Sequence, residues 1–339
     1  MTAAPDDGAV RLSAVPGDTR QGPLVLGGRT FSPHELVVMA IVNRTPDSFY
    51  DRGETYAAAA AVAAAERALD ARAAIVDIGG VKAGRGPGVS VAQELDRVVG
   101  VIETLRRHRP EAVISVDTWR AEVARAGVAA GADLLNDPWE GHDPELVQVA
   151  AQTGAGLVCT HAGHVPPRTD PDDPQYDDLL ADVLSTVVEL ADRAVALGVR
   201  RDGLVIDPGH DLGKTTTQSL EITRRLGELT ATGWPVLVAV SNKDFIGETL
   251  DLPVDRRLTG TLAATTVAAW LGARIFRAHN VSEVRQALDM TASIRGERPP
   301  AAPHRGAVLP GNQVRARPAA RPTRQRLDVA PPPTQGCTA

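Results

Sequence analysis

The sequence is poor in aromatic residues and cysteine, and it contains no long hydrophobic run. Only 3% of its 339 residues are aromatic, so aliphatic side chains and alanine must fill the core that a hydrophobic content of 43% allows. The two cysteines, Cys159 and Cys337, are too few for a disulfide framework or a cysteine-ligated zinc site. No apolar stretch reaches the ~18 residues of a membrane span, and no basic-then-apolar signal segment opens the chain. With a net charge of −6, which argues against general nucleic-acid binding, this predicts a cytoplasmic protein without membrane or nucleic-acid partners.

The sequence does contain short apolar segments that alternate with helical segments. We expect strands at 36–42, 74–78, 113–116, 134–135, 156–159, 204–206, 236–240 and 274–277. Helical patterns include 56–71, 92–108, 121–130, 145–153, 178–197, 257–271 and 281–295. Strict alternation requires a parallel sheet, and no G-x-G-x-x-G motif follows the first strand. Eight repeats therefore favour a closed (β/α)₈ TIM barrel over an open dinucleotide-binding sheet.

Three further segments complete the predicted organisation. Residues 24–31, with Gly27-Gly28 at their centre, have the pattern of a hairpin that could plug the bottom of the barrel. Residues 1–23 are interpreted as a flexible arm, 24–296 as the barrel domain, and 297–339 as a disordered tail rich in Pro and Arg. The tail lacks the apolar residues whose burial would offset its ordering entropy.

Polar side chains stand where most of the expected strands end. The run 36–51, LVVMAIVNRTPDSFYD, changes abruptly from apolar residues to a turn rich in groups that bind oxyanions and metal ions. In a TIM barrel the carboxyl ends of the strands meet at one mouth, so these side chains are expected to converge. The set comprises Asn43, Asp77, Asp117, Asn136, His161, Asp207, Lys243, Arg277 and His279. Asp77 and His161 also have structural interpretations, as a turn residue and as a buried histidine bonded to backbone.

This set divides by chemistry. An amide oxygen beside two cationic or donor groups, from the first and eighth strands, suits a phosphate or diphosphate with its magnesium ion. That group comprises Asn43, Arg277 and His279. Other members offer acceptors and donors that suit a flat heterocycle with amino and carbonyl edges. They are Asp117, Asn136, Asp207 and Lys243.

The motifs that carry these residues resemble, in order, those of the dihydropteroate synthase family. They are MAIVNRTPDSF at 39–49, DIGG at 77–80, SVDT at 115–118, LND at 135–137, IDPG at 206–209 with GK at 213–214, SNKDFIG at 241–247 and RAH at 277–279. The resemblance covers residues 36–295. It implies condensation of 7,8-dihydropterin-6-ylmethyl diphosphate with the aryl amine 4-aminobenzoate, release of diphosphate, a Mg²⁺ cofactor and a homodimer.

The resemblance also implies roles for individual residues. The pterin ring would be held by Asp117, Asn136, Asp207 and Lys243. Asn43 would ligate Mg²⁺, and Arg277 and His279 would hold the diphosphate. The catalytic residues would be Lys243, Arg277 and His279, and residues 45–48 would belong to a mobile loop over the site.

The sequence departs from the family mainly on the 4-aminobenzoate side. The family's Glu-Ser-Thr-Arg-Pro-Gly, Gly-Phe-Gly-Lys and Ser-Arg-Lys-Ser correspond here to VKAGRGPG at 81–88, DLGK at 211–214 and SNKD at 241–244, and Thr160 stands where a methionine often flanks the pterin. Asp244 replaces a serine near the acceptor carboxylate, and two like charges ~4 Å apart repel by about 4 kcal/mol at an effective dielectric of 20. Arg44 and Asp244 are counted among the residues that would contact substrate, and Arg44, Lys82 or Arg85 could restore positive charge.

These departures leave more than one function open. The chain could be a working synthase whose acceptor charge is compensated. It could instead be a paralogue that keeps the pterin and diphosphate pocket with weak or no synthase activity. A third alternative is a non-catalytic dimer that binds a pterin-like ligand or a partner, and methyltetrahydrofolate-binding methyltransferases, which would leave Arg277 and His279 unexplained, are a distant fourth.

Overall fold

The structure, a computed structural model, describes residues 21–45, 55–84, 86–169, 171 and 173–303. The chain divides into two units, residues 1–299 and 300–339, and only residues 300–303 of the second are described. The predicted arm and tail therefore lie largely outside the described residues, and the proposed domain boundaries stay a prediction. No helix within the described ranges is long and apolar enough to cross a membrane.

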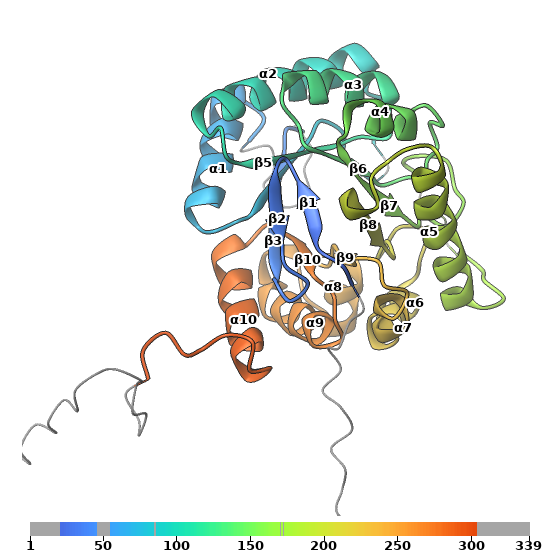
Figure 1. Cartoon of the computed structure of the whole chain (residues 1–339). Helices are drawn as coiled ribbons and strands as arrows, with labels where there is room; N and C mark the ends of the chain where they lie inside the picture. The colour runs from blue at the N-terminus through green and yellow to red at the C-terminus, as the bar shows by residue number, and fades with distance from the viewer. Residues whose placement is uncertain (1–20, 46–54, 85, 170, 172, 304–339) are drawn as a thin grey trace, which may run out of the picture. The chain divides into compact units, whose positions relative to one another are not determined.

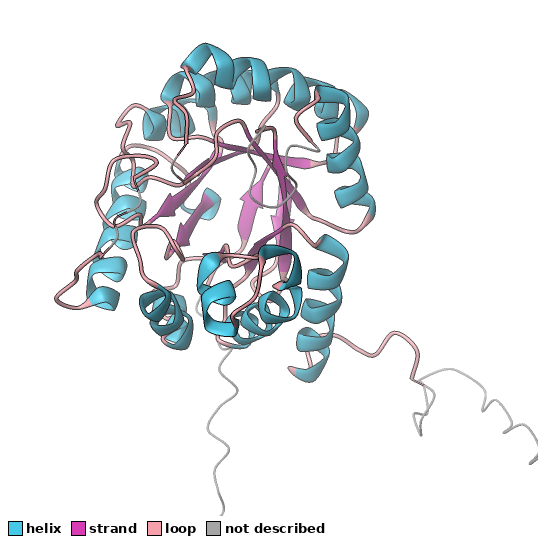
Figure 2. Cartoon of the chain, turned by 180° about the vertical axis from the view of Figure 1, so that it is seen from behind, coloured by secondary structure: helices cyan, strands magenta, loops and turns pink. Residues whose placement is uncertain are grey.

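Eight parallel strands form a barrel surrounded by helices, which confirms the predicted TIM-barrel fold (Figures 1 and 2). In sheet order the strands are β8 (Leu204–Asp207), β7 (Gly156–Thr160), β6 (Leu134–Asp137), β5 (Val113–Asp117), β4 (Ile75–Gly79), β3 (Val37–Asn43), β10 (Ile275–Ala278) and β9 (Leu237–Val238). A parallel bridge joins Ile206 to Val236 beside β9, and the Ile206 N–H donates to the Pro235 carbonyl at 2.9 Å. These contacts bring the two end strands together and nearly close the barrel.

The helices cover the outside of the strands (Figure 2). They are α1 (Ala58–Asp70), α2 (Val91–His108), α3 (Ala121–Ala130), α4 (Leu146–Thr153), α5 (Leu179–Ala196), α6 (Thr216–Arg224), α7 (Leu226–Thr230), α8 (Asp244–Leu250), α9 (Leu258–Trp270) and α10 (Val281–Ile294). Ser90 and Thr215 begin α2 and α6 with capping boxes that satisfy the first N–H groups of each helix. The helical patterns predicted from the sequence do not include α6, α7 and α8. With five and seven residues, α7 and α8 are too short to complete the repeats that reveal helical periodicity.

The predicted N-terminal hairpin is present as β1 (Leu24–Leu26) and β2 (Arg29–Phe31). Gly27 and Gly28 have φ of +54° and +78°, the two left-handed residues that a tight hairpin turn requires. The hairpin's Leu24, Leu26 and Phe31 pack inside the barrel against the first inward side chains of the strands. A Cβ on Gly156, at the start of β7, would overlap Leu26 Cδ2, so a glycine there makes room for the plug.

The barrel core follows the two-residue alternation of its strands. On β3, Val37 and Met39 belong to the inner cluster, whereas Val38, Ala40 and Val42 pack outward against the helices. The other strands alternate in the same way, because successive side chains of a strand point to opposite faces. This alternation decides which polar residues at the strand ends can reach the barrel mouth.

Candidate functional site

The side chains that point into the barrel become polar at the carboxyl ends of the strands. On β5, Val113 lies in the inner cluster and Asp117 follows it at the same parity, while Ile114 and Val116 pack outward. The same parity places Asn136 on β6 and Asp207 on β8 at the mouth. A cavity of about 590 Å³ opens there. Its lining includes Asn43, Asp117, Asn136, Thr160, Asp207, Lys243, Asp244 and Arg277.

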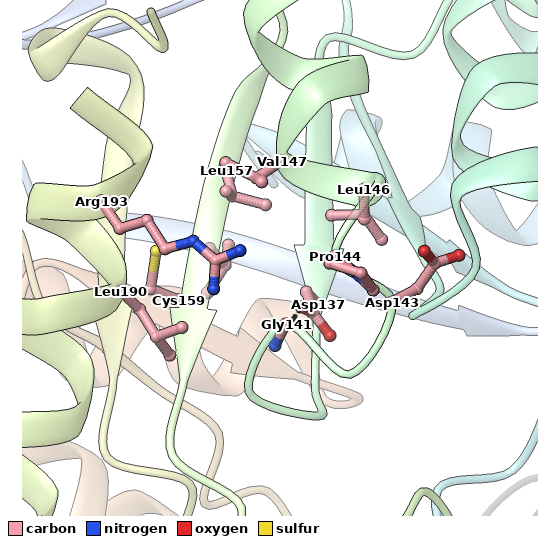
Figure 3. A pocket seen from close by; sticks show the side chains of 11 residues that line it. Asp137, Gly141, Asp143, Pro144, Leu146, Val147, Leu157, Cys159, Leu190 and Arg193 are labelled. Carbon is pink, nitrogen blue, oxygen red and sulfur yellow. Dashed lines mark hydrogen bonds between the residues drawn. The ribbon is translucent and has the colours of Figure 1, made fainter. Parts of the chain in front are cut away.

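The adjacent residues of the opposite parity face away from this cavity. Asp137 and Cys159 line a separate small pocket beside Leu190 (Figure 3). Asp137 accepts hydrogen bonds from the backbone N–H groups of Trp139 at 2.9 Å and Gly141 at 2.8 Å, so its carboxylate shapes the turn after β6. Burial raises the pKa of Asp137 to about 6 and that of the Cys159 thiol far above its ordinary value. The thiol is therefore unreactive, and the polar chemistry lies at the mouth.

Arg277 joins two carboxylates from neighbouring strands. Its Nε donates to Asp77 Oδ2 and its Nη2 donates to Asp117 Oδ2, each at 2.6 Å. Asn136 Nδ2 also donates to Asp77 Oδ2, at 3.1 Å. Burial raises the pKa of Asp117 to about 7, with Arg277 opposing the shift and Asp77 adding to it. One guanidinium thus faces two buried carboxyl groups, and Asp117 changes charge near neutral pH.

Asp207 and Lys243 bring opposite charges to the other side of the cavity. The Gly209 N–H donates to Asp207 Oδ1 at 2.8 Å, and Lys243 Nζ donates to the His210 carbonyl. Burial raises the pKa of Asp207, opposed by Lys243. Burial also lowers the pKa of Lys243, opposed by Asp211 and Asp207. Together they offer an acceptor and a donor to the edge of a bound ring.

Asp244 is paired with a cation that the sequence analysis did not identify. Arg257 Nη1 lies 2.7 Å from Asp244 Oδ1, and both residues line the cavity. The Asp244 side chain is 80% exposed, whereas that of Arg257 is 13% exposed. Solvent and Arg257 therefore both weaken the repulsion that Asp244 would exert on an acceptor carboxylate.

Two of the predicted substrate ligands, Arg44 and His279, lie outside the lining of this cavity. Arg44 donates from Nε to the Tyr56 carbonyl at 2.8 Å and from Nη1 to the Asp96 carbonyl at 2.6 Å. It therefore ties the end of β3 to α2. His279 Nδ1 lies 3.1 Å from Ser241 Oγ. Arg85 and the predicted loop residues 46–48 lie outside the described residues.

The cavity also contains residues that sequence reasoning missed. Trp139 and Val254 line it, as does Arg257. No local pattern marks Arg257, because it lies on the segment before α9 and reaches the site only through folding. The sequence also did not predict that Asp77 pairs with Arg277 and Asn136. Its inward direction was predictable, because Asp77 lies two residues after the inward Ile75 on β4.

Asn43 presents an oxygen where a magnesium ion could bind. Asn43 lines the cavity at the barrel mouth, and its Oδ1 and Asp117 Oδ2 both lie close to Gly79, at the ends of neighbouring strands. Mg²⁺ binds such hard oxygen ligands, commonly one or two from protein with others from water and phosphate. The residues present therefore fit the ion.

Comparisons with known proteins place this site in a family. The family model described as pterin binding enzyme matches residues 39–279. The chain is 52% identical to inactive dihydropteroate synthase 2 of Mycobacterium leprae, over 83% of this chain and 98% of the relative. It is 37% identical to dihydropteroate synthase of Escherichia coli, over 76% and 89%.

Solved structures agree with this placement. The dihydropteroate synthase of Yersinia pestis in a sulfonamide drug complex has a TM-score of 0.77 at 35% identity, covering 81% of this chain and all of that chain. The Xanthomonas albilineans synthase with 4-aminobenzoic acid has a TM-score of 0.74 at 35% identity, covering 84% and 100%. The chain belongs to the pterin-binding enzyme family, and within it is a divergent relative of the dihydropteroate synthases.

Proposed function

We propose that this protein binds 7,8-dihydropterin-6-ylmethyl diphosphate and is a paralogue with weak or no synthase activity toward 4-aminobenzoate. The observation that carries the proposal is the uneven cavity. Its lining includes the residues predicted to hold the ring, Asp117, Asn136, Asp207 and Lys243, and also the Asp244–Arg257 ion pair, which stands where the resemblance implies the acceptor. An anionic acceptor there must compete with Asp244 for the guanidinium.

The ring-side residues have the chemistry that the first substrate needs. The carboxylates of Asp117 and Asp207 would accept N–H bonds from the amino edge of the pterin, and Asn136 and Lys243 would meet its carbonyl and ring nitrogens. Departure of diphosphate leaves positive charge on the pterin methylene, which the buried carboxylates would stabilise. Arg277, which lines the cavity, would hold the diphosphate, and Mg²⁺ at Asn43 would neutralise part of its charge. His279 would have to turn toward the cavity to share this role.

We also propose a homodimer, acting in the cytoplasm. Four large apolar side chains on α8, α9 and α10 are exposed: Leu250, Val267, Met290 and Ile294. Met290 and Ile294 lie one turn apart on α10, and contiguous exposed apolar surface is a mark of subunit contacts. Sedimentation of the wild type and of a Met290→Asp, Ile294→Asp double variant tests the dimer, since charges in the contact should yield monomers.

Calorimetric titration with the pterin diphosphate, beside a steady-state assay with 4-aminobenzoate, tests the main proposal. Binding with no or slow turnover is expected, and absence of binding would refute it. Asp207→Asn should weaken binding by about 2 kcal/mol, or about 30-fold, because a charged hydrogen-bond acceptor is lost. Asp133→Asn is the control, since Asp133 precedes β6 at the end of the barrel opposite the cavity and pairs with Arg106. It should leave affinity unchanged.

A working synthase is the second candidate function, and one observation favours it. Asp244 paired with Arg257 repels a carboxylate acceptor less strongly than an unpaired Asp244 would. Sustained turnover in the same assay would establish this alternative over the first.

A further inference from the structure

A second group of charged and imidazole side chains lies where the chain leaves β7. His161 continues the outward series of that strand, after Leu157 and Cys159. Gly163 and His164 both have left-handed backbones, with φ of +78° and +57°. These two residues turn the chain back, so that the rings of His161 and His164 lie edge to face with centroids 5.5 Å apart.

Two carboxylates converge on these rings. Asp182, on α5, places Oδ1 2.7 Å from His161 Nε2 and 3.0 Å from His164 Nε2. Glu140 places Oε1 3.8 Å from His161 Nε2 and Oε2 3.2 Å from His164 Nδ1. The potential ligand atoms of Glu140, His161 and His164 all lie within 4.8 Å of one another.

We propose that Glu140, His161, His164 and Asp182 form a structural site for a divalent transition metal, of which Zn²⁺ fits best. Two imidazoles and two carboxylates form a ligand set of intermediate softness, which suits zinc better than magnesium or calcium. Tetrahedral zinc with bonds of about 2.0–2.1 Å separates its ligand atoms by about 3.3 Å. Glu140, His161 and His164 already bring one ligand atom each within 4.8 Å of one another, and Asp182, 2.7 Å from His161 Nε2, must shift its carboxylate to become the fourth ligand.

The surroundings of His161 orient its ring for this role. Lys214 Nζ lies 2.7 Å from His161 Nδ1, 3.3 Å from the His161 carbonyl and 2.8 Å from the Leu212 carbonyl. Without a metal ion, Lys214 Nζ can donate to both carbonyls and to His161 Nδ1, and His161 Nε2–H donates to Asp182. With a metal ion on Nε2, Nδ1 takes a proton from Lys214, whose amine then accepts from Nδ1–H, and the Nε2 proton is released. A partner on the other ring nitrogen fixes histidine ligands in this manner at known metal sites.

The cluster has its own access from solvent and is separate from the pterin cavity. His164 and Asp182 line an open pocket of about 810 Å³ together with Tyr176, and this pocket shares no lining residue with the cavity at the barrel mouth. A metal here would tie the loop after β7 to α5. That loop continues to Thr169, which lines the mouth cavity, so the ion would hold one wall of the cavity in place.

Titration of the full-length protein with Zn²⁺ and with Co²⁺ tests the site. We expect one ion per chain, micromolar or tighter affinity, a rise in melting temperature and the visible absorption of tetrahedral Co²⁺. Failure to bind either ion at millimolar concentration would overturn the proposal. No pterin is needed, so the result is independent of the proposed function.

Variants distinguish this cluster from other histidines. His164→Ala removes a half-exposed side chain and should weaken Zn²⁺ binding at least about tenfold, the loss that even an outer-shell change causes. Asp182→Asn should act in the same direction. His108→Ala is the matched control, because His108 also pairs with a carboxylate, Glu66, at 3.0 Å. Equal Zn²⁺ affinity of the His164→Ala and His108→Ala proteins, with both melting like the wild type, would refute the assignment.

Discussion

Replacing Asp244 by serine isolates the charge that separates this cavity from those of the synthases it resembles. An acceptor carboxylate ~4 Å from Asp244 would be repelled by about 1 kcal/mol at the dielectric of water, and by about 4 kcal/mol at an effective dielectric of 20. The side chain is 80% exposed, so the lower value applies. Loss of Asp244 also frees Arg257, and an exposed ion pair contributes up to about 1 kcal/mol. The expected gain for 4-aminobenzoate is therefore about 1–2 kcal/mol, or about 5- to 30-fold in Kd.

Calorimetric titration of the wild type and Asp244→Ser measures this gain, with pterin and diphosphate present in both. Uncharged 4-aminobenzamide is the control ligand, because its affinity should not respond to the charge at this position. Arg257→Met should change 4-aminobenzoate affinity in the opposite direction. The electrostatic account would fail if Asp244→Ser left the affinity for 4-aminobenzoate unchanged. It would also fail if the substitution raised the affinities for 4-aminobenzoate and 4-aminobenzamide equally.

Three further outcomes are expected. Because pterin N–H groups need an ionised Asp117 and its pKa in the free protein is about 7, pterin affinity should fall as pH drops below 7 and level off above it, as titration at pH 5 to 9 would reveal. Because folding raises the pKa of Asp117, its ionised carboxylate lowers the free energy of unfolding above pH 7, and this loss disappears as pH falls toward 3.8. Asp117→Asn should therefore reduce the pH dependence of the free energy of unfolding, as measured by urea denaturation. Gly156→Ala should lower the free energy of unfolding by about 1–3 kcal/mol, because its Cβ would meet Leu26 and the Gly203 carbonyl, whereas Gly100→Ala, with open space around it, should not.

The parity of side chains along the strands explains what the sequence analysis placed well and what it misplaced. Asn43, Asp117, Asn136 and Asp207 lie two or four positions after an inward apolar residue of the same strand, so their convergence could be predicted from alternation and barrel closure. His161 was grouped with them because it also ends a strand. Its parity is outward, and the structure places it among Lys214, Asp182 and His164 instead.

The sequence alone determined the barrel, its hairpin and the polar rim, because all three depend on local signals: apolar runs, helical periodicity, a Gly-Gly turn and the residue type at each strand end. Only the tertiary structure decided which charges meet. Arg257 reaches Asp244 from a separate segment, Arg277 joins Asp77 to Asp117 across neighbouring strands, and Arg44 turns away to backbone carbonyls. Such pairings depend on loop paths and side-chain directions that arise when distant segments pack, and no short-range pattern in the chain encodes them.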